Sequence, residues 1–304
     1  MSEKKKIVVF PASGWQGRSV CNTLSKDPKY DITAIVRNPD SPKLNAGGTD
    51  LRTMNVKIVK GDFADPSSYR AHLTGVYGVY INTDFWSIHA ENGKDTPKGI
   101  ETEVKYGTDV INECKAAGIK HFVFSSLFEA CDIDETMYAI ADRRLNDVLA
   151  KSGIPHTLYY IAGYWESIEW YDMLKVAEDG SITLGLFMPD KLTQHFTSVR
   201  GVGAFIQQIF DDPGKFIGER FLDRFLSSAP QTDLILMTKS DSGKEVLNAV
   251  EYETWGSFAT RLSKLSGKPI STPNFSDEVW NSDGMKQGLG ELHNVMDSLY
   301  RTSR

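Results

Sequence analysis

A short turn rich in small residues follows the first apolar run of the chain and has the composition of a phosphate-binding loop. Its members are Ala12, Ser13, Gly14, Trp15, Gln16 and Gly17. Where such a turn opens a helix, the unpaired backbone N–H groups and the helix dipole both favour a negatively charged ligand such as a pyrophosphate. Gly14 would let that ligand approach closely, and Gly17 would let the helix lie against the strand. The turn therefore predicts a dinucleotide site.

A second feature selects among dinucleotides. The predicted strand 31–36 ends at Arg37 and Asn38, where an NAD-specific fold usually has an acid that hydrogen-bonds the ribose 2′-hydroxyl. Arginine instead presents a planar, permanently charged set of donors that suits a 2′-phosphate. We therefore expect NADP(H) as the cofactor, with Lys43 as a weaker second ligand of the phosphate. The alternative is that Arg37 is a solvated surface residue.

The elements that must position these residues alternate between strand and helix. Short apolar runs predict six strands, at residues 7–10, 31–36, 56–60, 76–81, 121–124 and 156–161. Helical spacing predicts helices at 100–117 and 135–151, and Asp65-Pro66 predicts a capped short helix. This alternation indicates an α/β protein with a doubly wound parallel Rossmann sheet. Ligands of such sheets lie beyond the carboxyl ends of the strands.

Beyond residue 162 the pattern becomes irregular. We expect residues 1–162 to form an NADP(H)-binding Rossmann domain, and residues 163–304 to form a smaller mixed α+β substrate or lid region that is interleaved with it. A helix at 167–177, a hairpin at Asp179-Gly180 and a last helix at 290–302 are predicted there. The segments 231–244 and 274–287 carry mixed signals and cannot be assigned.

Composition disfavours several classes of function. The net charge of −6 argues against direct binding of nucleic acid, which needs clustered Lys and Arg. Three cysteines without CxxC spacing indicate a reducing compartment, and six histidines without paired spacing predict no metal site. No apolar stretch is long enough to span a membrane. We expect a cytoplasmic protein, with the nucleus as the alternative location.

The chain resembles the NmrA-like family of the atypical short-chain dehydrogenase/reductase superfamily over residues 4–225. The resemblance lies in the order of the segments VVFPASGWQG, AIVRNP, GDFAD, YINTDFW, FVFSSL, SGIPHT and GYWES. It implies that Gly14 to Gly17 hold the pyrophosphate, Arg37 and Asn38 the 2′-phosphate, Asp62 and Phe63 the adenine, and Asn82 and Thr83 the ribose. Near the nicotinamide it implies Ser125, Tyr164, Trp165, Glu166 and Ser167. Core packing is an equal alternative for Tyr164 and Trp165.

Two residues depart from the family's pattern. Pro11 stands where the family commonly has glycine, which removes one backbone donor and fixes φ at about −65°. Asp142 stands where reductase-like relatives have a lysine near the nicotinamide ribose. The usual Tyr-x-x-x-Lys pair is therefore absent, although Tyr138 lies four residues before Asp142. Carbonyl reduction with tyrosine as the acid loses its usual support.

These departures leave two functions open. One is an NADPH-dependent reductase or cyclase acting on an imine or iminium of a bulky apolar nitrogen heterocycle, because such a cation needs nearby negative charge more than a proton donor. Its catalytic candidates are Asp142, Tyr138, Glu129 and Tyr164, and its substrate pocket would consist of Phe85, Trp86, Phe128, Trp165 and Trp170. The alternative is a non-catalytic NAD(P) redox sensor that regulates a protein partner such as a transcription factor.

Overall fold

A parallel sheet forms the centre of the fold. The computed structural model describes residues 3–46, 48–127, 137–161, 163–185, 190–191, 193–217, 235–236, 239–240, 243–248, 251–273 and 277–289. Within these residues, seven strands pair in parallel in the order β15-β8-β7-β6-β1-β2-β5. Two short strands, β13 (Ile235–Leu236) and β14 (Lys239–Ser240), add to β15 in antiparallel orientation. The predicted doubly wound α/β fold is confirmed.

All six predicted strands are present in the sheet. They are β1 (Lys5–Phe10), β2 (Tyr30–Val36), β5 (Lys57–Lys60), β6 (Gly78–Asn82), β7 (His121–Leu127) and β8 (His156–Ile161). The seventh parallel strand, β15 (Gly243–Asn248), comes from a part of the chain that the sequence pattern did not assign. It pairs with β8 although more than eighty residues separate the two strands.

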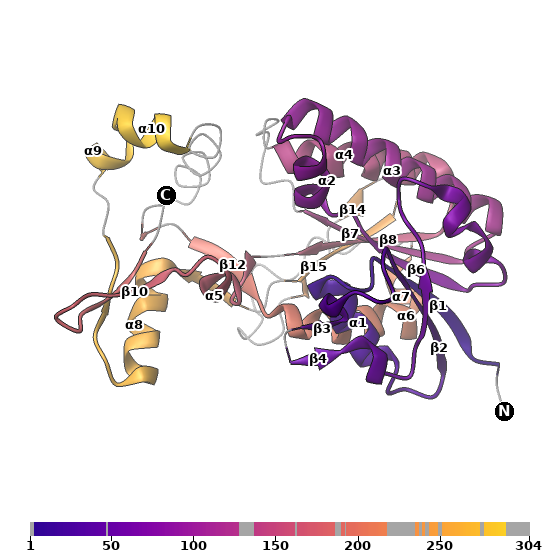
Figure 1. Cartoon of the computed structure of the whole chain (residues 1–304), viewed down its shortest axis with the longest axis horizontal. Helices are drawn as coiled ribbons and strands as arrows, with labels where there is room; N and C mark the ends of the chain where they lie inside the picture. The colour runs from indigo at the N-terminus through magenta and orange to yellow at the C-terminus, as the bar shows by residue number, and fades with distance from the viewer. Residues whose placement is uncertain are drawn as a thin grey trace.

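Helices cover both faces of the sheet (Figure 1). One face carries α2 (Phe85–Glu91), α3 (Thr96–Ala117) and α4 (Met137–Ser152), whereas the other carries α1 (Trp15–Leu24), α6 (Val202–Asp211) and α7 (Pro213–Phe216). Strand side chains alternate between the two resulting cores, so that Phe122 and Phe124 face α3 and α4 while Val123 faces α1 and α6. A Cβ on Gly203 of α6 would lie 2.2 Å from the Ser19 carbonyl oxygen of α1, so these helices meet at backbone distance.

Short elements connect these layers. The β2–β5 connection contains a 3-10 turn at Pro42–Leu44 and a small hairpin of β3 (Asn45–Ala46) and β4 (Thr49–Asp50). The predicted cap at Asp65 is confirmed, because its side chain accepts a hydrogen bond from the Ser67 N–H at the start of the 3-10 turn Pro66–Ser68. Gly118 ends α3 in the left-handed conformation (φ 71°), as its position after the helical pattern predicts.

Most of the remaining described elements form an appendage with its own core, separate from the sheet in Figure 1. It contains two three-stranded sheets, β10 (Leu174–Val176), β11 (Ile182–Leu184) and β17 (Ile270–Ser271), and β9 (Gly163–Tyr164), β12 (Thr193–Thr197) and β16 (Glu251–Thr254). Its helices are α5 (Ser167–Trp170), α8 (Trp255–Ser266), α9 (Asp277–Trp280) and α10 (Asp283–Leu289). Phe196, Trp255, Phe258 and Trp280 are buried in its core.

One predicted helix of the appendage is wrong beyond its first turn. The helix expected at 167–177 ends at Trp170, and Asp172 adopts a left-handed conformation (φ 47°). Leu174–Val176 then pairs with β11, so the hairpin supplies the backbone hydrogen bonds that a longer helix would have supplied. The hairpin turn itself is confirmed, with Gly180 at φ 84°. The predicted helix 290–302 lies outside the described residues.

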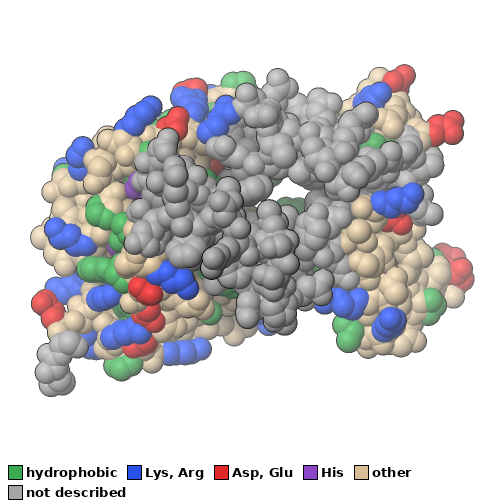
Figure 2. Space-filling model, turned by 180° about the vertical axis from the view of Figure 1, so that it is seen from behind, with side chains coloured by type: hydrophobic (Ala, Val, Ile, Leu, Met, Phe, Trp, Pro, Cys, Tyr) green, Lys and Arg blue, Asp and Glu red, His purple; other side chains and the backbone are tan. Residues whose placement is uncertain are grey.

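Charged side chains of both signs are interspersed on the described surface of the sheet body in Figure 2. None of the described helices has the length and apolarity needed to cross a bilayer. Among the described residues, no group of three or more His, Cys, Asp or Glu side chains is arranged to hold a metal ion.

Candidate dinucleotide site

The glycine turn places the N-terminus of α1 at the carboxyl edge of the sheet. β1 ends at Phe10, and the turn is fixed to the sheet by a hydrogen bond from the Ala12 N–H to the Ile35 carbonyl (2.8 Å). Gly14 precedes α1 in an extended conformation, and no side chain caps the helix there. The N–H groups of the first turn thus lie at an end of the helix where an anion is favoured.

The two glycines of the turn have different surroundings. A Cβ on Gly17 would lie 2.1 Å from the Pro11 carbonyl oxygen, so no side chain fits between α1 and the end of β1. A Cβ on Gly14 would meet no protein atom within 4 Å. The protein itself therefore requires glycine at position 17, whereas position 14 is open on the side from which a ligand would approach.

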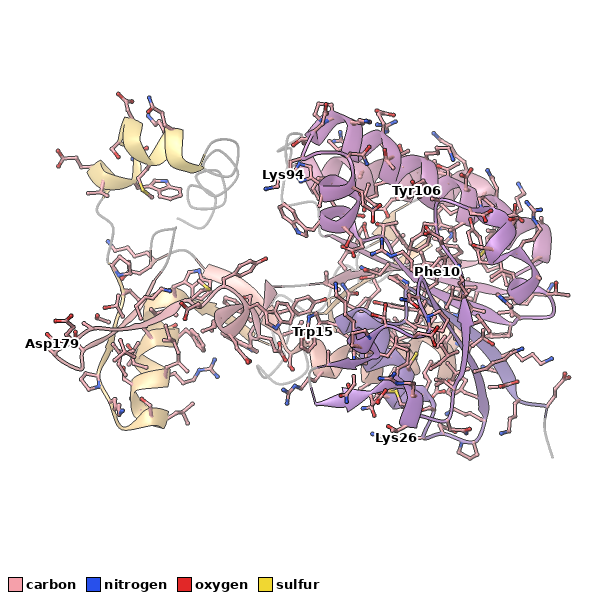
Figure 3. The ribbon with its side chains drawn as sticks, viewed as in Figure 1. Phe10, Trp15, Lys26, Lys94, Tyr106 and Asp179 are labelled. Atoms are coloured by element: carbon pink, nitrogen blue, oxygen red, sulfur yellow. The ribbon has the colours of Figure 1, made fainter. Side chains whose placement is uncertain are left out.

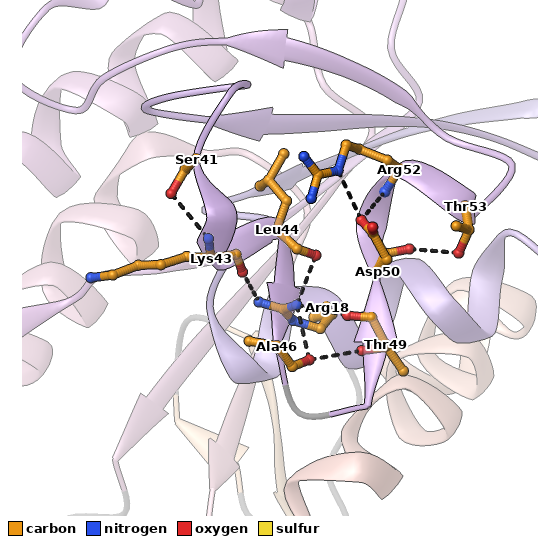
Figure 4. Close-up of polar contacts among 9 residues, drawn as sticks. All are labelled: Arg18, Ser41, Lys43, Leu44, Ala46, Thr49, Asp50, Arg52 and Thr53. Carbon is orange, nitrogen blue, oxygen red and sulfur yellow. Dashed lines mark hydrogen bonds and ion pairs between the residues drawn. The ribbon is translucent and has the colours of Figure 1, made fainter.

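A buried arginine that the sequence analysis missed holds this turn against the β2–β5 connection. The Arg18 guanidinium donates hydrogen bonds to five backbone carbonyls, those of Ser13, Lys43, Leu44, Ala46 and Thr49. Figure 4 shows Arg18 with the residues of the β2–β5 connection that it contacts. Burial lowers the pKa of Arg18, and the nearby Asp50 carboxylate opposes that effect. One cation thereby links the glycine turn to the loop that carries Lys43. The sequence feature that could have revealed this role is a charged residue directly after Gly17, within the apolar face of a helix.

The side chain of Gln16 points toward strands β6 and β7, which form the floor of the site. Its Oε1 atom accepts hydrogen bonds from the Ser125 hydroxyl (2.6 Å) on β7 and from the Tyr80 hydroxyl (2.5 Å) on β6. Burial raises the pKa of Tyr80, so its hydroxyl stays protonated and can donate. The structure thus brings together Gln16 and Ser125, which sequence reasoning had assigned to different ends of the cofactor.

Arg37 lies at the carboxyl end of β2, as predicted, with about half of its side chain exposed. It forms an ion pair with Glu91 at the end of α2. Asn38 uses its side chain locally, because Oδ1 accepts a hydrogen bond from the Asp40 N–H (3.0 Å). Lys43 lies in the following 3-10 turn and is exposed. An unburied guanidinium is therefore present at the position expected for a 2′-phosphate ligand.

The residues predicted to contact adenine and ribose follow β5 and β6. The Asp62 carboxylate accepts a hydrogen bond from the Ala64 N–H (2.9 Å), and the Phe63 ring is buried and stacks on Phe10 with 3.8 Å between centroids. Asn82 pairs in register with Ser125 of β7, so the two lie side by side at the sheet edge. Thr83, directly after β6, is buried.

The aromatic residues expected around the nicotinamide lie in different environments. Trp165 stacks between Phe196 (4.1 Å) and Phe258 (4.4 Å) in the core of the appendage. The Glu166 carboxylate accepts hydrogen bonds from the Ser198 hydroxyl and the Val199 N–H. These contacts give both residues structural partners within the chain.

A second aromatic group joins the appendage to the glycine turn. Trp15, at the first position of α1, stacks on Trp170 of α5 with 5.0 Å between centroids, and Trp170 contacts Tyr164 edge to face. Figure 3 shows Trp15 at the end of the sheet body that faces the appendage. On α2, Phe85 is buried against Ile100 of α3, whereas the adjacent Trp86 is 57% exposed.

The proposed catalytic residues that the structure describes lie on two elements, α4 and β9. Asp142 is buried on α4, and Tyr138 lies one turn earlier on the same helix. The Tyr164 hydroxyl is buried and has no hydrogen-bond partner among the described residues. Burial, followed by the proximity of Tyr80 and Tyr159, raises the pKa of Tyr164, which keeps its hydroxyl protonated. Phe128 and Glu129 lie outside the described residues.

A buried carboxyl group on α3 was not singled out by the sequence. Glu103 is 1% exposed and accepts a hydrogen bond from the Thr83 hydroxyl. Burial raises the pKa of Glu103 to about 7; the Thr83 hydrogen bond opposes this effect and the Asp84 charge adds to it. The sequence feature that could have revealed its burial is its position on the helix, where it continues the apolar stripe through Ile100 and Gly107.

Comparisons with known proteins identify the relatives of this chain. A model of the NmrA-like family matches residues 3–251. An NmrA-like family domain-containing protein of Dictyostelium discoideum is 24% identical over 266 residues, which cover 82% of this chain and 82% of that protein. An NmrA-like family domain-containing oxidoreductase of Aspergillus hancockii is 32% identical over 120 residues, which cover 40% of this chain but only 33% of the relative.

Two solved structures share the fold. The structure of NmrA, a negative transcriptional regulator, in complex with NADP superposes with a TM-score of 0.71 at 16% identity and covers 98% of this chain and 83% of that chain. The Citrobacter sp. triphenylmethane reductase complexed with NADP(H) superposes with a TM-score of 0.61 at 17% identity, covering 98% and 90%. Since the family model spans most of the sequence, the chain belongs to the NmrA-like family.

Proposed function

We propose that this protein binds NADP(H) across the carboxyl edge of the sheet and acts as an oxidoreductase on a small molecule. The observation that supports the cofactor is the uncapped start of α1 behind an open Gly14, with the Arg37 guanidinium at the next strand end. Relatives named as oxidoreductases and fold neighbours crystallised with NADP(H) support the same proposal.

The residues present fit this cofactor. The first-turn N–H groups of α1 would hold the pyrophosphate, and Arg37 would hold the 2′-phosphate, with Lys43 as a second cation. Asp62, Asn82 and Thr83 would contact the adenosine, while Ser125 lies on the floor beside Gln16. When bound, the cofactor supplies or accepts a hydride. The protein's own contribution is to orient the dinucleotide and to exclude water.

The substrate we propose is a bulky apolar molecule, with an imine or iminium of a nitrogen heterocycle as the specific case. Trp15, Trp86 and Trp170 are partly exposed and offer flat apolar surfaces. Asp142 would place a carboxylate where relatives have a lysine, which would favour a cationic substrate electrostatically. Tyr164, which stays protonated, can donate a hydrogen bond but is a poor base. The appendage would cover this end of the sheet as a lid.

Cofactor selectivity tests the proposal directly. Replacing Arg37 with alanine should weaken NADPH binding by roughly 1.5–3 kcal/mol, the range for hydrogen bonds to charged groups, or about 10- to 150-fold in Kd. NADH affinity should change little. Isothermal titration calorimetry on the purified full chain measures both. Arg52→Ala is a matched control, because Arg52 is a half-exposed arginine that pairs with Asp50 in the same loop region. Equal losses for NADPH and NADH would exclude a role of Arg37 in 2′-phosphate binding.

Turnover distinguishes this proposal from a second one. Because Trp165 is enclosed by Phe196 and Phe258, part of the space assigned to a substrate is filled by side chains, which favours a non-catalytic NAD(P) sensor that regulates a protein partner. The protein is incubated with NADPH and a panel of cyclic imines while the reduced-nicotinamide absorbance and the products are followed. Tight NADPH binding without any product would favour the sensor.

A further inference from the structure

Behind the ends of β6 and β7 lies a group of buried polar side chains to which neither the sequence nor the proposed cofactor contacts give a role. Glu103 of α3 is bonded through one oxygen to the Thr83 hydroxyl, and its other oxygen has no partner among the described residues. The Ser126 hydroxyl on β7 and both amide atoms of Asn146 on α4 are also buried without a described partner. Buried polar atoms are ordinarily satisfied, so several unsatisfied atoms in one region call for an explanation.

The topology places these side chains on the same side of the sheet. Asn82 of β6 is in register with Ser125 of β7, so the next residues, Thr83 and Ser126, are also neighbours. Ser126 alternates with Phe122 and Phe124 and therefore faces α3 and α4. The same side is capped by the α3–α4 contact, where a Cβ on Gly107 would lie 2.6 Å from Leu145. Glu103 lies one turn before Gly107, and Asn146 directly follows Leu145.

The groups around Glu103 affect the balance between its protonated and ionised forms. Asp84, on the segment after β6, repels the ionised form, and Asp142 adds a second buried carboxyl group on α4. On α2, His89 packs against Gly99, one turn before Glu103. Burial, reinforced by Asp84 and opposed by the Thr83 hydrogen bond, raises the pKa of Glu103 to about 7, where a small change in potential moves its proton.

We propose that Glu103 is the proton-exchanging group of this edge of the sheet, taking up a proton when an anionic dinucleotide binds at the strand ends and releasing it when the dinucleotide leaves. The inference rests on the proposed cofactor function. A bound dinucleotide adds several negative charges at the strand ends and displaces water from them, and both effects disfavour a second negative charge just behind Thr83. Thr83 is the group through which the two sites would communicate.

Proton-linked binding is measured by titrating NADP+ and NADPH into the full-length protein by calorimetry at pH 7.5, in buffers of different ionisation enthalpy. We expect a net uptake of a fraction of a proton per dinucleotide in the wild type, and its loss in Glu103→Gln, which keeps the shape and removes the ionisation. Glu101→Gln is the matched control. Glu101 lies on the same helix but is exposed and paired with Arg144, so this variant should retain the uptake.

The pH dependence of affinity gives a second readout. Relative to Glu103→Gln, the wild type should lose affinity as the pH rises through 7, by about tenfold for each unit by which binding raises the pKa. Comparison with the variant removes the titration of the 2′-phosphate itself. Side-chain 13C NMR of the free protein should show a Glu103 carboxyl that titrates near neutrality and shifts when dinucleotide is added.

The possible results are distinct. Dinucleotide binding with the same proton uptake in the wild type and Glu103→Gln would overturn this inference and leave the cofactor proposal intact. No binding to the wild type would overturn both. If Glu103→Gln fails to fold, the NMR titration of the wild type decides, and a carboxyl that does not respond to dinucleotide refutes the proton exchange.

Discussion

The ion pair between Arg37 and Glu91 leads to a prediction about cofactor selectivity. The Glu91 carboxylate pairs with the Arg37 guanidinium that we expect to hold the 2′-phosphate, so the carboxylate and the phosphate compete for the same cation. Replacing Glu91 with glutamine removes the competing charge and keeps the size of the side chain. We therefore expect Glu91→Gln to bind NADPH more tightly than the wild type, with little change for NADH.

The size of this effect follows from the exposure of the pair. Both side chains are 53% exposed, and the ion pair that must be broken is therefore worth about 0–1 kcal/mol. A carboxylate that remains about 6 Å from the phosphate repels it by about 0.7 kcal/mol per unit charge in water. Together these terms predict a gain of about 1–2 kcal/mol, or roughly 5- to 30-fold in Kd.

Calorimetric titrations of NADPH and NADH at low and high salt measure this gain. It should shrink at high ionic strength, because exposed charges are screened. Glu113→Gln is a suitable control, since Glu113 pairs with an exposed arginine, Arg70, elsewhere on the surface. If Arg37→Ala weakens NADPH binding but Glu91→Gln leaves it unchanged, the competition argument is wrong even though Arg37 binds the phosphate.

Three further predictions concern the scaffold of the site. Gly17→Ala should lower the free energy of unfolding in urea by about 1–3 kcal/mol, because the added Cβ collides with the Pro11 carbonyl. Gly14→Ala, whose added Cβ meets no protein atom, should unfold like the wild type but bind dinucleotide less tightly. Arg18→Lys should cost at least about 2 kcal/mol, since an ammonium cannot reach five carbonyls in a fixed plane, and an unchanged urea midpoint would contradict this. Burial lowers the pKa of His121 from 6.5 to about 3, so as the pH falls the unfolded chain binds this proton before the folded chain does. The free energy of unfolding should therefore fall by about 1.4 kcal/mol for each pH unit below 6.5. A urea unfolding midpoint of the wild type that does not decrease between pH 6.5 and 5.5 would refute this.

Much of the sheet body could be predicted because its signals are local. A buried parallel strand reads as a short apolar run, and a helix reads as a 3.6-residue repeat, so each of the six strands and both long helices appear where the pattern places them. The close packing at Gly17 and the position of Arg37 at a strand end follow from the spacing within one strand–turn–helix unit and the next strand. These features need no knowledge of distant residues.

The features that could not be predicted depend on residues far apart in the sequence. The pairing of β15 with β8, the five carbonyls gathered around Arg18 and the enclosure of Trp165 by Phe196 and Phe258 each join segments whose separation leaves no periodic trace. The helix predicted at 167–177 failed for a different reason, because pairing with β11 in a local hairpin outweighed the helical preference of 174–176.

The sequence by itself determined the order of strands and helices in the sheet body as far as β8, the glycine turn and the cation expected to select the cofactor, since each is encoded by neighbouring residues. Only the tertiary structure decided which polar groups are buried together. Glu103 illustrates the difference: its side chain is an ordinary carboxylate in the sequence, and it becomes a group that titrates near neutrality only because folding removes it from water and places Thr83 and Asp84 beside it.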